Sequence, residues 1–161
     1  DPKASLAEQA RAVATVFDRL VGTWDTRFSF IAEDGTITHS TGELRFGWIM
    51  DGRALQDLWI SYPKDGKGER TIGTTIRYFD HAAKIWRVVF FAPAFGAMIN
   101  MSGGAEGNRI VLRGTDGAGL ALRWTFNDIQ ADSFVWRGEV SSDGGRTWRL
   151  GEEHQMRRRK G

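Results

Sequence analysis

Four residues of this sequence could act as general acids or bases, although none lies in a recognisable catalytic motif. A sheltered His or carboxylate can move a proton while an Arg or Trp N–H group stabilises the developing negative charge. The candidate catalytic residues are His39, Asp57, Glu139 and His154, with Arg53 and Arg77 as candidate donors. A structural ion pair or a surface position is the alternative role for each of them.

Metal and nucleotide chemistry find little support in the sequence. There is no Cys, and the three His are scattered without the paired spacing of a metal site, so we expect no metal. No Gly-rich phosphate loop and no Gly-x-Ser-x-Gly elbow occur, so we expect no cofactor. Haem stays open as a weaker alternative, which needs an axial His. His39 and His154 could reach an interior, whereas His81 follows Asp80 in a turn and is expected to face solvent.

Seven Trp and ten Phe recur at alternate positions of strand-like segments, where they would project from one face of a pleated sheet. Such sets include Trp24 with Phe28, and Trp148 with Leu150 and Met156. These rings either fill a core or line a cavity, and indole is a bulky choice for simple filling. The candidate ligand-binding residues are Trp48, Arg53, Asp57, Trp59, Arg77, Trp86, Phe90, Trp124 and Trp136.

The segment 53–62 mixes charge and apolar residues on one face. Arg53, Asp57 and Trp59 share a parity in this segment. If that face points inward, the two charges must pair with each other or meet a ligand, because isolated buried charges are too costly. If it points outward, the pair is exposed and of little energetic value.

The elements that would hold these side chains are short strands separated by turn residues. After a short amphipathic helix within 1–21, capped by Ser5, the pattern predicts strands at 23–32, 36–48, 53–62, 70–79, 84–92, 97–103, 108–114, 119–127, 133–141 and 146–156. Gly and Asp between the strands favour tight reversals. The spacing leaves no room for crossover helices, so the sheet is antiparallel. We expect one domain over 1–161, all-β, with a ten-stranded antiparallel barrel at 22–157 and a basic tail at 158–161, and a sandwich as the alternative.

The triplet Gly22-Thr23-Trp24 resembles the Gly-x-Trp signature of lipocalins and other calycins, in which the Trp closes the base of the barrel. Phe46-Gly47-Trp48, the run 51–59, the run 73–78 and Arg123-Trp124-Thr125-Phe126 look like an uncharacterised bacterial calycin-like group, the DUF1579-like proteins, over residues 20–157. The strand count is similar to that of fatty-acid-binding proteins and of nitrobindin, a haem-binding calycin. The resemblance implies a calycin-like barrel and brings no substrate or catalytic residue.

The segment Ser141-Ser142-Asp143-Gly144-Gly145-Arg146-Thr147-Trp148 matches the Asp-box pattern of sialidases. A single copy in so short a chain predicts a turn braced by side chains, not a propeller enzyme.

Charge and hydropathy narrow the function further. The residues Arg157, Arg158, Arg159 and Lys160 supply more than the whole net charge of +2, so no basic face for nucleic acid is expected. No apolar run could span a bilayer, and no signal peptide is evident, which predicts a cytoplasmic protein unless a segment is removed. We expect the barrel to bind a small apolar or aromatic molecule in its lumen. The alternatives are a cofactor-independent isomerase, lyase or cyclase in the same pocket, and an interaction module that forms a homodimer.

Overall fold

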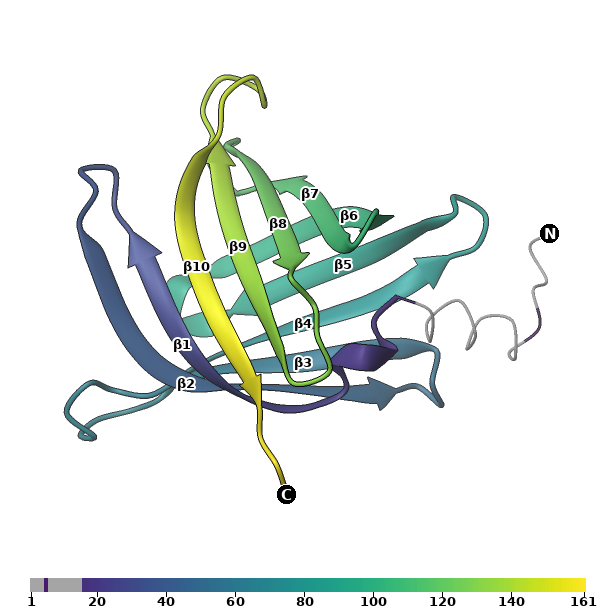
Figure 1. The fold of residues 1–161 in the computed structure, drawn as a ribbon. Helices are drawn as coiled ribbons and strands as arrows, with labels where there is room; N and C mark the ends of the chain where they lie inside the picture. Colours follow the sequence, from purple (N-terminus) through teal and green to yellow (C-terminus); the bar gives the residue numbers. More distant parts are fainter. Residues whose placement is uncertain (1–4, 6–15) are drawn as a thin grey trace.

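The structure is a computed structural model that describes Ser5 and residues 16–161. Within this part of the chain ten strands follow one another along the sequence (Figure 1). Their bounds are β1 (Gly22–Ile31), β2 (Ile37–Ile49), β3 (Ala54–Ser61), β4 (Thr71–Asp80), β5 (Ile85–Ala92), β6 (Ala97–Glu106), β7 (Arg109–Thr115), β8 (Ala121–Asn127), β9 (Ser133–Ser141) and β10 (Arg149–Arg158). Two 3-10 turns, η1 (Asp18–Leu20) and η2 (Pro93–Phe95), complete the described elements.

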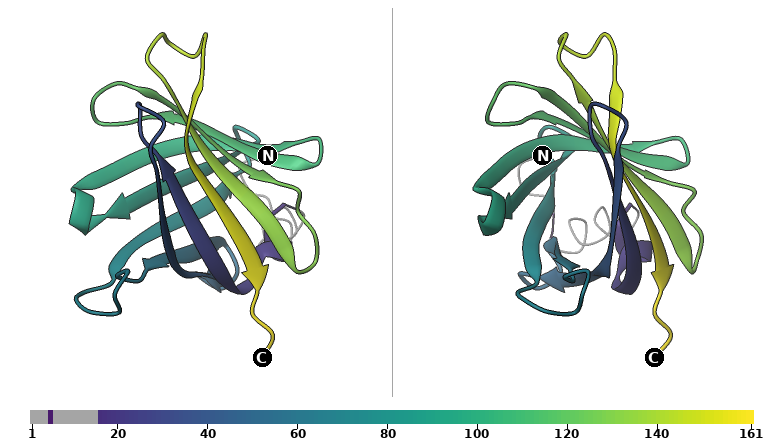
Figure 2. Two further views of the ribbon diagram at one scale, coloured as in Figure 1. Left: turned by 60° about the vertical axis from the view of Figure 1, so that its left-hand side comes forward. Right: turned by 90° about the vertical axis from the view of Figure 1, so that its left-hand side faces the viewer.

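The strands form one closed antiparallel barrel, as the sequence predicted. Each strand pairs with its neighbour in the chain, and β1 closes the barrel by pairing with β10. The closing register sets Phe28 of β1 opposite His154 of β10. The views in Figure 2 show the strands curving around a common interior. Closure leaves no free sheet edge in the barrel, which removes a template for aggregation.

One end of the barrel is filled by large apolar side chains. Phe17 and Leu20 are fully buried there beside Trp24. The indole Nε1 of Trp24 donates a hydrogen bond to the carbonyl oxygen of Leu20 at 2.8 Å, and its ring meets Phe134 edge-on at 4.7 Å. Trp24 therefore closes the base of the barrel, as the resemblance to calycins implied.

The predicted N-terminal helix is supported only as a short turn. Asp18–Leu20 form the 3-10 turn η1, because the carbonyl of Phe17 accepts from the backbone N–H of Leu20 at 2.9 Å. Positions 6–15, which held most of the predicted helix, lie outside the described residues.

The last strand corrects the predicted facing of its aromatic residues. A bulge between Leu150 and Glu152 shifts the register of β10 against β9. Leu150 lies opposite Glu139, and Trp148 packs under the guanidinium of Arg123, so both belong to the outer face. The prediction that Trp148 and Leu150 share a face with Met156 was wrong, because the extra residue of a bulge reverses the alternation.

The predicted basic tail also begins too early, because Arg158 is the last residue of β10. Its guanidinium lies 4.2 Å from the ring centre of Trp24. It donates to the carbonyl oxygens of Val21 and Arg19, both at 2.6 Å, and of Ala131 at 2.8 Å. Arg158 thus ties the end of the last strand to the start of the first.

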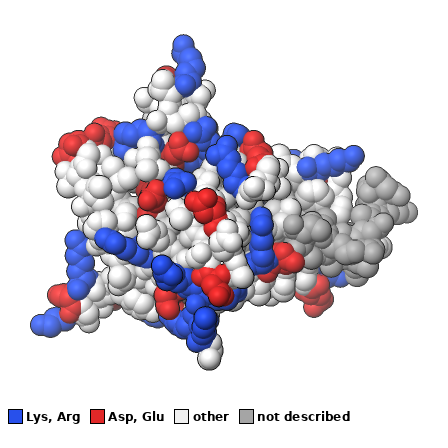
Figure 3. All heavy atoms as spheres, viewed as in Figure 1, with Lys and Arg blue, Asp and Glu red and all other residues white. Residues whose placement is uncertain are grey.

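The outer face of β8, β9 and β10 carries acidic and basic side chains side by side (Figure 3). Arg123 binds Glu139 with two hydrogen bonds of 3.1 and 2.8 Å, and Arg137 binds Glu153 at 2.8 Å. This face therefore has mixed charge. Among the residues described, no helix has the length and apolar character needed to cross a membrane.

Candidate functional site

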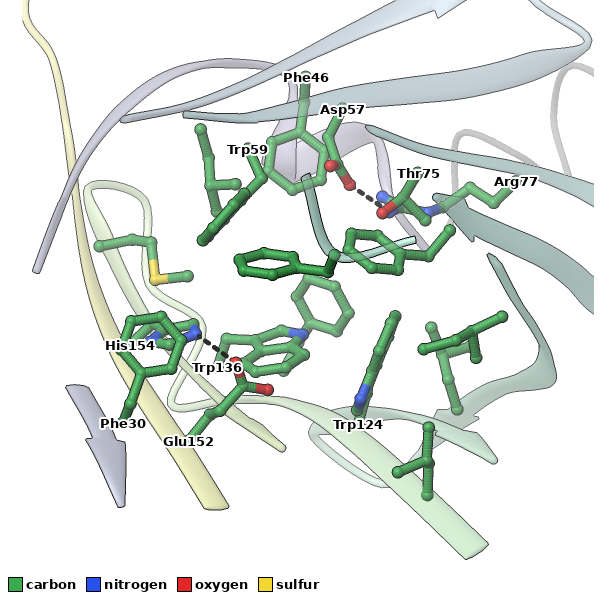
Figure 4. A pocket seen from close by; sticks show the side chains of 18 of the residues that line it. Phe30, Phe46, Asp57, Trp59, Thr75, Arg77, Trp124, Trp136, Glu152 and His154 are labelled. Atoms are coloured by element: carbon green, nitrogen blue, oxygen red, sulfur yellow. Dashed lines mark hydrogen bonds and ion pairs between the residues drawn. The ribbon is translucent and has the colours of Figure 1, made fainter. Parts of the chain in front are cut away.

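The other end of the barrel holds a partly open cavity of about 460 Å³. This volume lies within the range of small-molecule sites, roughly 300–1,000 Å³. Most of its wall is apolar, and its Phe and Trp members come from β1, β2, β3, β5, η2, β8 and β9 (Figure 4). They are Phe30, Phe46, Trp59, Phe90, Phe95, Trp124, Phe126 and Trp136.

For the rings that lie on strands, the alternation of side chains places them inside the barrel. Trp124 meets Phe90 edge-on at 5.4 Å and Trp136 at 5.4 Å, so aromatic contacts continue from β5 across to β9. The ring centres of Phe95 and Trp59 lie 6.2 Å apart. Such tilted and edge-on contacts are favourable arrangements for aromatic pairs, and they hold the rings in place around the space.

His154 and Glu152 form a polar pair in the aromatic wall (Figure 4). The imidazole of His154 is 4% exposed and stacks flat on Trp136, with ring centres 5.0 Å apart. Its Nε2 lies 3.7 Å from Oε1 of Glu152. The two side chains project from the same face of β10, since they stand two residues apart beyond the bulge.

The backbone fixes which nitrogen of His154 carries the proton. The N–H of Ser29 donates to Nδ1 at 3.3 Å, so the neutral ring has its proton on Nε2. A His that binds iron through Nε2 usually donates its Nδ1 proton to an acceptor. The amide of Ser29 is a donor, so the arrangement at His154 does not fit an axial haem ligand.

Asp57 and Arg77 form a buried ion pair on β3 and β4. Arg77 is 1% exposed and Asp57 5%, and Nη2 of Arg77 donates to Oδ2 of Asp57. Burial raises the pKa of Asp57, while the charge and hydrogen bond of Arg77 and a hydrogen bond from Thr75 oppose that rise. Both residues border the cavity. The face of the segment 53–62 that carries Asp57 and Trp59 therefore points inward.

Six of the nine predicted ligand-binding residues border this cavity. They are Asp57, Trp59, Arg77, Phe90, Trp124 and Trp136. Trp86 is buried in the filled end instead, where its ring meets Phe17 at 4.7 Å. Trp48, near the end of β2, is 39% exposed and does not border the cavity. Arg53 lies in the turn before β3 and binds the carbonyl oxygen of Met50, because β3 begins one residue later.

The candidate catalytic residues separate into two inside and two outside. His154 and Asp57 border the cavity. His39 is exposed and shares a 2.9 Å hydrogen bond with Ser29, and Glu139 is paired with Arg123 on the outer face. The expectation that His81 faces solvent was wrong: its ring packs edge-on against Phe79 at 4.9 Å, and its Nε2 is enclosed.

Several residues at the cavity were not anticipated, among them Glu152, Phe95 and Asp116. Glu152 shares its inward parity with His154 and Met156, so alternation counted back from Met156 would have found it. Phe95 is carried by the short turn η2, and Asp116 by the turn between β7 and β8. The alternation of side chains along a strand does not predict where the side chains of a turn point. Phe95 and Asp116 could therefore not be predicted from the sequence pattern.

The Asp-box segment is a braced turn between β9 and β10. The carboxylate of Asp143 accepts from the backbone N–H groups of Arg146 at 3.0 Å and Thr147 at 2.9 Å, and from the Thr147 hydroxyl at 2.6 Å. These bonds lower the pKa of Asp143. The motif therefore serves the turn, as predicted.

Solved structures share this fold with little sequence identity. The Mycobacterium tuberculosis protein Rv2717c has a TM-score of 0.68 at 14% identity, with 92% of this chain and 98% of that one covered. The S-type phycobiliprotein lyase CPES of Guillardia theta has a TM-score of 0.66 at 10% identity, covering 95% and 98%. No family model matches the chain, and no curated protein matches its sequence. At this identity the two likenesses establish a calycin-like barrel as the fold.

Proposed function

We propose that this barrel binds a small, mainly apolar or aromatic molecule in the cavity bordered by Trp59, Trp124 and Trp136. The observation that carries the proposal is a partly open cavity of about 460 Å³ whose wall is mostly apolar and includes eight Phe and Trp side chains. Burying an apolar ligand there removes its surface from water, which stabilises the complex in proportion to the area buried. A few polar groups in such a wall fix the orientation of the ligand.

Two polar pairs are available for that orientation. Asp57 with Arg77 lies on β3 and β4, and Glu152 with His154 lies on β10. A ligand that touches both has polar groups separated by an apolar part. The barrel thus suits a molecule with a conjugated or aromatic body and few heteroatoms.

Tryptophan fluorescence tests the binding proposal directly. Titration with a panel of naphthalene and anthracene derivatives is expected to change the emission saturably, with a one-to-one end point. Trp136→Phe is expected to reduce the change, because Trp136 borders the cavity. Trp48→Phe is the matched control, since Trp48 is outside the cavity wall and its loss leaves the change intact. A chain that responds to no member of the panel contradicts the proposal.

We propose proton transfer as a second function of the same cavity, supported by the pair Glu152 and His154. A carboxylate beside an N–H donor at the cavity wall is suited to taking a proton from a bound carbon acid and returning it. Such a step serves isomerases, lyases and cyclases that need no cofactor. CPES is named a lyase, so a barrel of this fold is compatible with that class of function.

Hydrogen exchange tests the second function without knowledge of the natural substrate. In D₂O the chain is expected to speed the exchange of the methyl protons of 2-acetylnaphthalene for deuterium. Glu152→Gln is expected to abolish the acceleration, and His39→Gln, on the outer face, to leave it unchanged. Exchange no faster than in buffer contradicts the enzymatic function and leaves the binding function in place.

The finer assignments rest on the sequence. We propose the DUF1579-like group as the family, on the segments that resemble it. We also propose that no resident cofactor is needed, that the partner is a small molecule and not nucleic acid, and that the protein acts in the cytoplasm. Homodimer formation is the alternative role, and light scattering of the purified chain would test it.

A further inference from the structure

The guanidinium of Arg77 has two N–H positions that no described residue satisfies. Nη2 donates to Asp57, but Nε and Nη1 are buried and have no acceptor among the described residues. A buried donor without a partner costs about 1–3 kcal/mol, and more when it is charged. Most buried donors in proteins do have partners, so two on one side chain indicate that something else supplies the acceptor.

The protein around Arg77 is poor in acceptors. The guanidinium carbon lies 5.0 Å from the ring centre of Phe17, 5.3 Å from that of Phe46 and 6.0 Å from that of Phe126. These rings favour the positive charge through their faces but offer no oxygen. Arg77 also borders the cavity, where a bound molecule can present one (Figure 4).

The charges around the cavity favour a neutral acceptor over an anionic one. Among the described residues that border it, Arg77 is the sole Lys or Arg, whereas Asp57, Asp116 and Glu152 are all carboxyl groups. Asp57 already binds Arg77. An anionic ligand would bring another negative charge beside Asp57 in a poorly solvated space, which is costly. A neutral oxygen can accept a hydrogen bond from one of the free N–H groups without that cost.

On the basis of the proposed binding function, we propose that the cavity takes neutral aromatic carbonyl compounds, whose carbonyl oxygen accepts a hydrogen bond from one of the two unpaired nitrogens of Arg77, Nε or Nη1. Aromatic ketones, aldehydes and quinones belong to this class. Their flat bodies match the aromatic wall formed by Trp59, Trp124 and Trp136.

Three probes of nearly equal shape test the proposal on the unmodified chain. They are 2-acetylnaphthalene, 2-isopropenylnaphthalene, which has a CH₂ group in place of the carbonyl oxygen, and 2-naphthoate, which is anionic at neutral pH. We expect the ketone to bind roughly tenfold or more tightly than the alkene, as one hydrogen bond to a charged donor provides. The naphthoate is expected to bind more weakly than the ketone.

Two variants test whether Arg77 causes the preference for the ketone over the alkene. Arg77→Met is expected to bring the ratio of ketone to alkene affinity close to one, while Arg113→Met, on the exposed outer face, keeps the wild-type ratio. If Arg77→Met does not fold, Arg77→Lys replaces it, and the ratio is expected to fall because Lys lacks the Nε and Nη1 geometry. An unchanged ratio in the folded variant overturns the proposal.

The outcomes for the wild-type chain separate this proposal from the proposed function. Equal affinity for ketone and alkene means that water satisfies Arg77, which overturns the carbonyl proposal and leaves apolar binding standing. Tighter binding of naphthoate than of the ketone overturns the argument from charge. Failure of all three probes to bind contradicts the proposed function itself, and this inference with it.

Discussion

At the scale of single residues, Asp57 and Arg77 form the most heavily buried of the described ion pairs. Removing one member leaves an uncompensated buried charge, whereas replacing both by apolar residues removes the problem. We expect Asp57→Ala to destabilise the fold by about 3–5 kcal/mol. The double variant Asp57→Leu, Arg77→Met is expected to be more stable than that single variant. Urea unfolding measures both.

The exposed pair of Glu106 and Arg113 is the control for this prediction. Each side chain is about half exposed, and such pairs contribute about 0–1 kcal/mol. Glu106→Ala is therefore expected to be nearly neutral. If Asp57→Ala costs no more than Glu106→Ala, the inner pair is not a buried ion pair in solution.

Glu43 makes the stability of the fold depend on pH. Although it stands on the outer side of β2, it is 1% exposed and accepts hydrogen bonds from Arg45 at 2.8 Å and from the Tyr62 hydroxyl at 2.6 Å. The hydrogen bond from Arg45, followed by that from Tyr62, lowers the pKa of Glu43 from 4.5 to about 2. The unfolded chain therefore binds the proton first, so stability falls as the pH drops from about 4.5 to 2.

Glu43→Gln tests this assignment. The substitution removes the titrating group, so the free energy of unfolding of the variant is expected to fall less steeply between pH 5 and 2 than that of the wild type. The measurement is urea unfolding at a series of pH values. Parallel curves for the two chains would show that Glu43 does not titrate with the fold.

Sequence alternation found some site residues and missed others for identifiable reasons. Asp57 and His154 were predicted as candidates because both are titratable residues on strands that could face the interior, and both border the cavity. Glu152 has the same inward parity as His154 and Met156, yet it was not singled out, because a carboxylate at that position gives no signal of its own. The tautomer of His154 on β10 depends on the backbone N–H of Ser29 on β1. The two residues are far apart in the sequence, so a local sequence pattern does not predict their contact.

At the scale of elements, close approach of strands requires glycine at particular positions. A Cβ at Gly42 of β2 would lie 1.9 Å from the carbonyl oxygen of Ile60 and 2.7 Å from the ring of Phe28. A Cβ at Gly47 of the same strand would meet nothing within 4 Å. The two glycines thus differ in packing while sharing a strand.

We expect Gly42→Ala to destabilise the barrel by about 1–3 kcal/mol, as overpacking does. Gly47→Ala is the matched control and is expected to change stability by no more than about 0.5 kcal/mol. Thermal unfolding compares the two variants. Similar losses for both would mean that β2 does not pack against β3 and β1 as described.

The strands themselves were predictable because alternation and turn residues act locally. All ten were anticipated, with bounds that differ from the observed ones by a few residues. The largest differences are three residues, at the end of β6, which lies at Glu106 instead of 103, and at the start of β10, which lies at Arg149 instead of 146. The later start of β10 follows from the braced turn around Asp143, which extends through Thr147. The turn is extended by side-chain hydrogen bonds, which the alternation of polar and apolar residues does not predict.

At the scale of the whole molecule, the barrel divides into a filled end and a hollow end. Phe17, Leu20 and Trp24 fill the first, and Trp59, Trp124 and Trp136 border the space in the second. Both ends are rich in aromatic residues, so composition alone could not tell which tryptophans fill and which line. Trp86 illustrates this, since it was expected at the cavity and lies in the filled end.

The hollow end of the barrel is predicted to hold one small aromatic molecule. Native mass spectrometry of the chain after exposure to 2-acetylnaphthalene tests it most directly, with Ile99→Trp as a variant whose added ring occupies the cavity that Ile99 borders. We predict one bound molecule per wild-type chain and none on the folded variant. Equal retention by both chains, or none by the wild type, would contradict the claim.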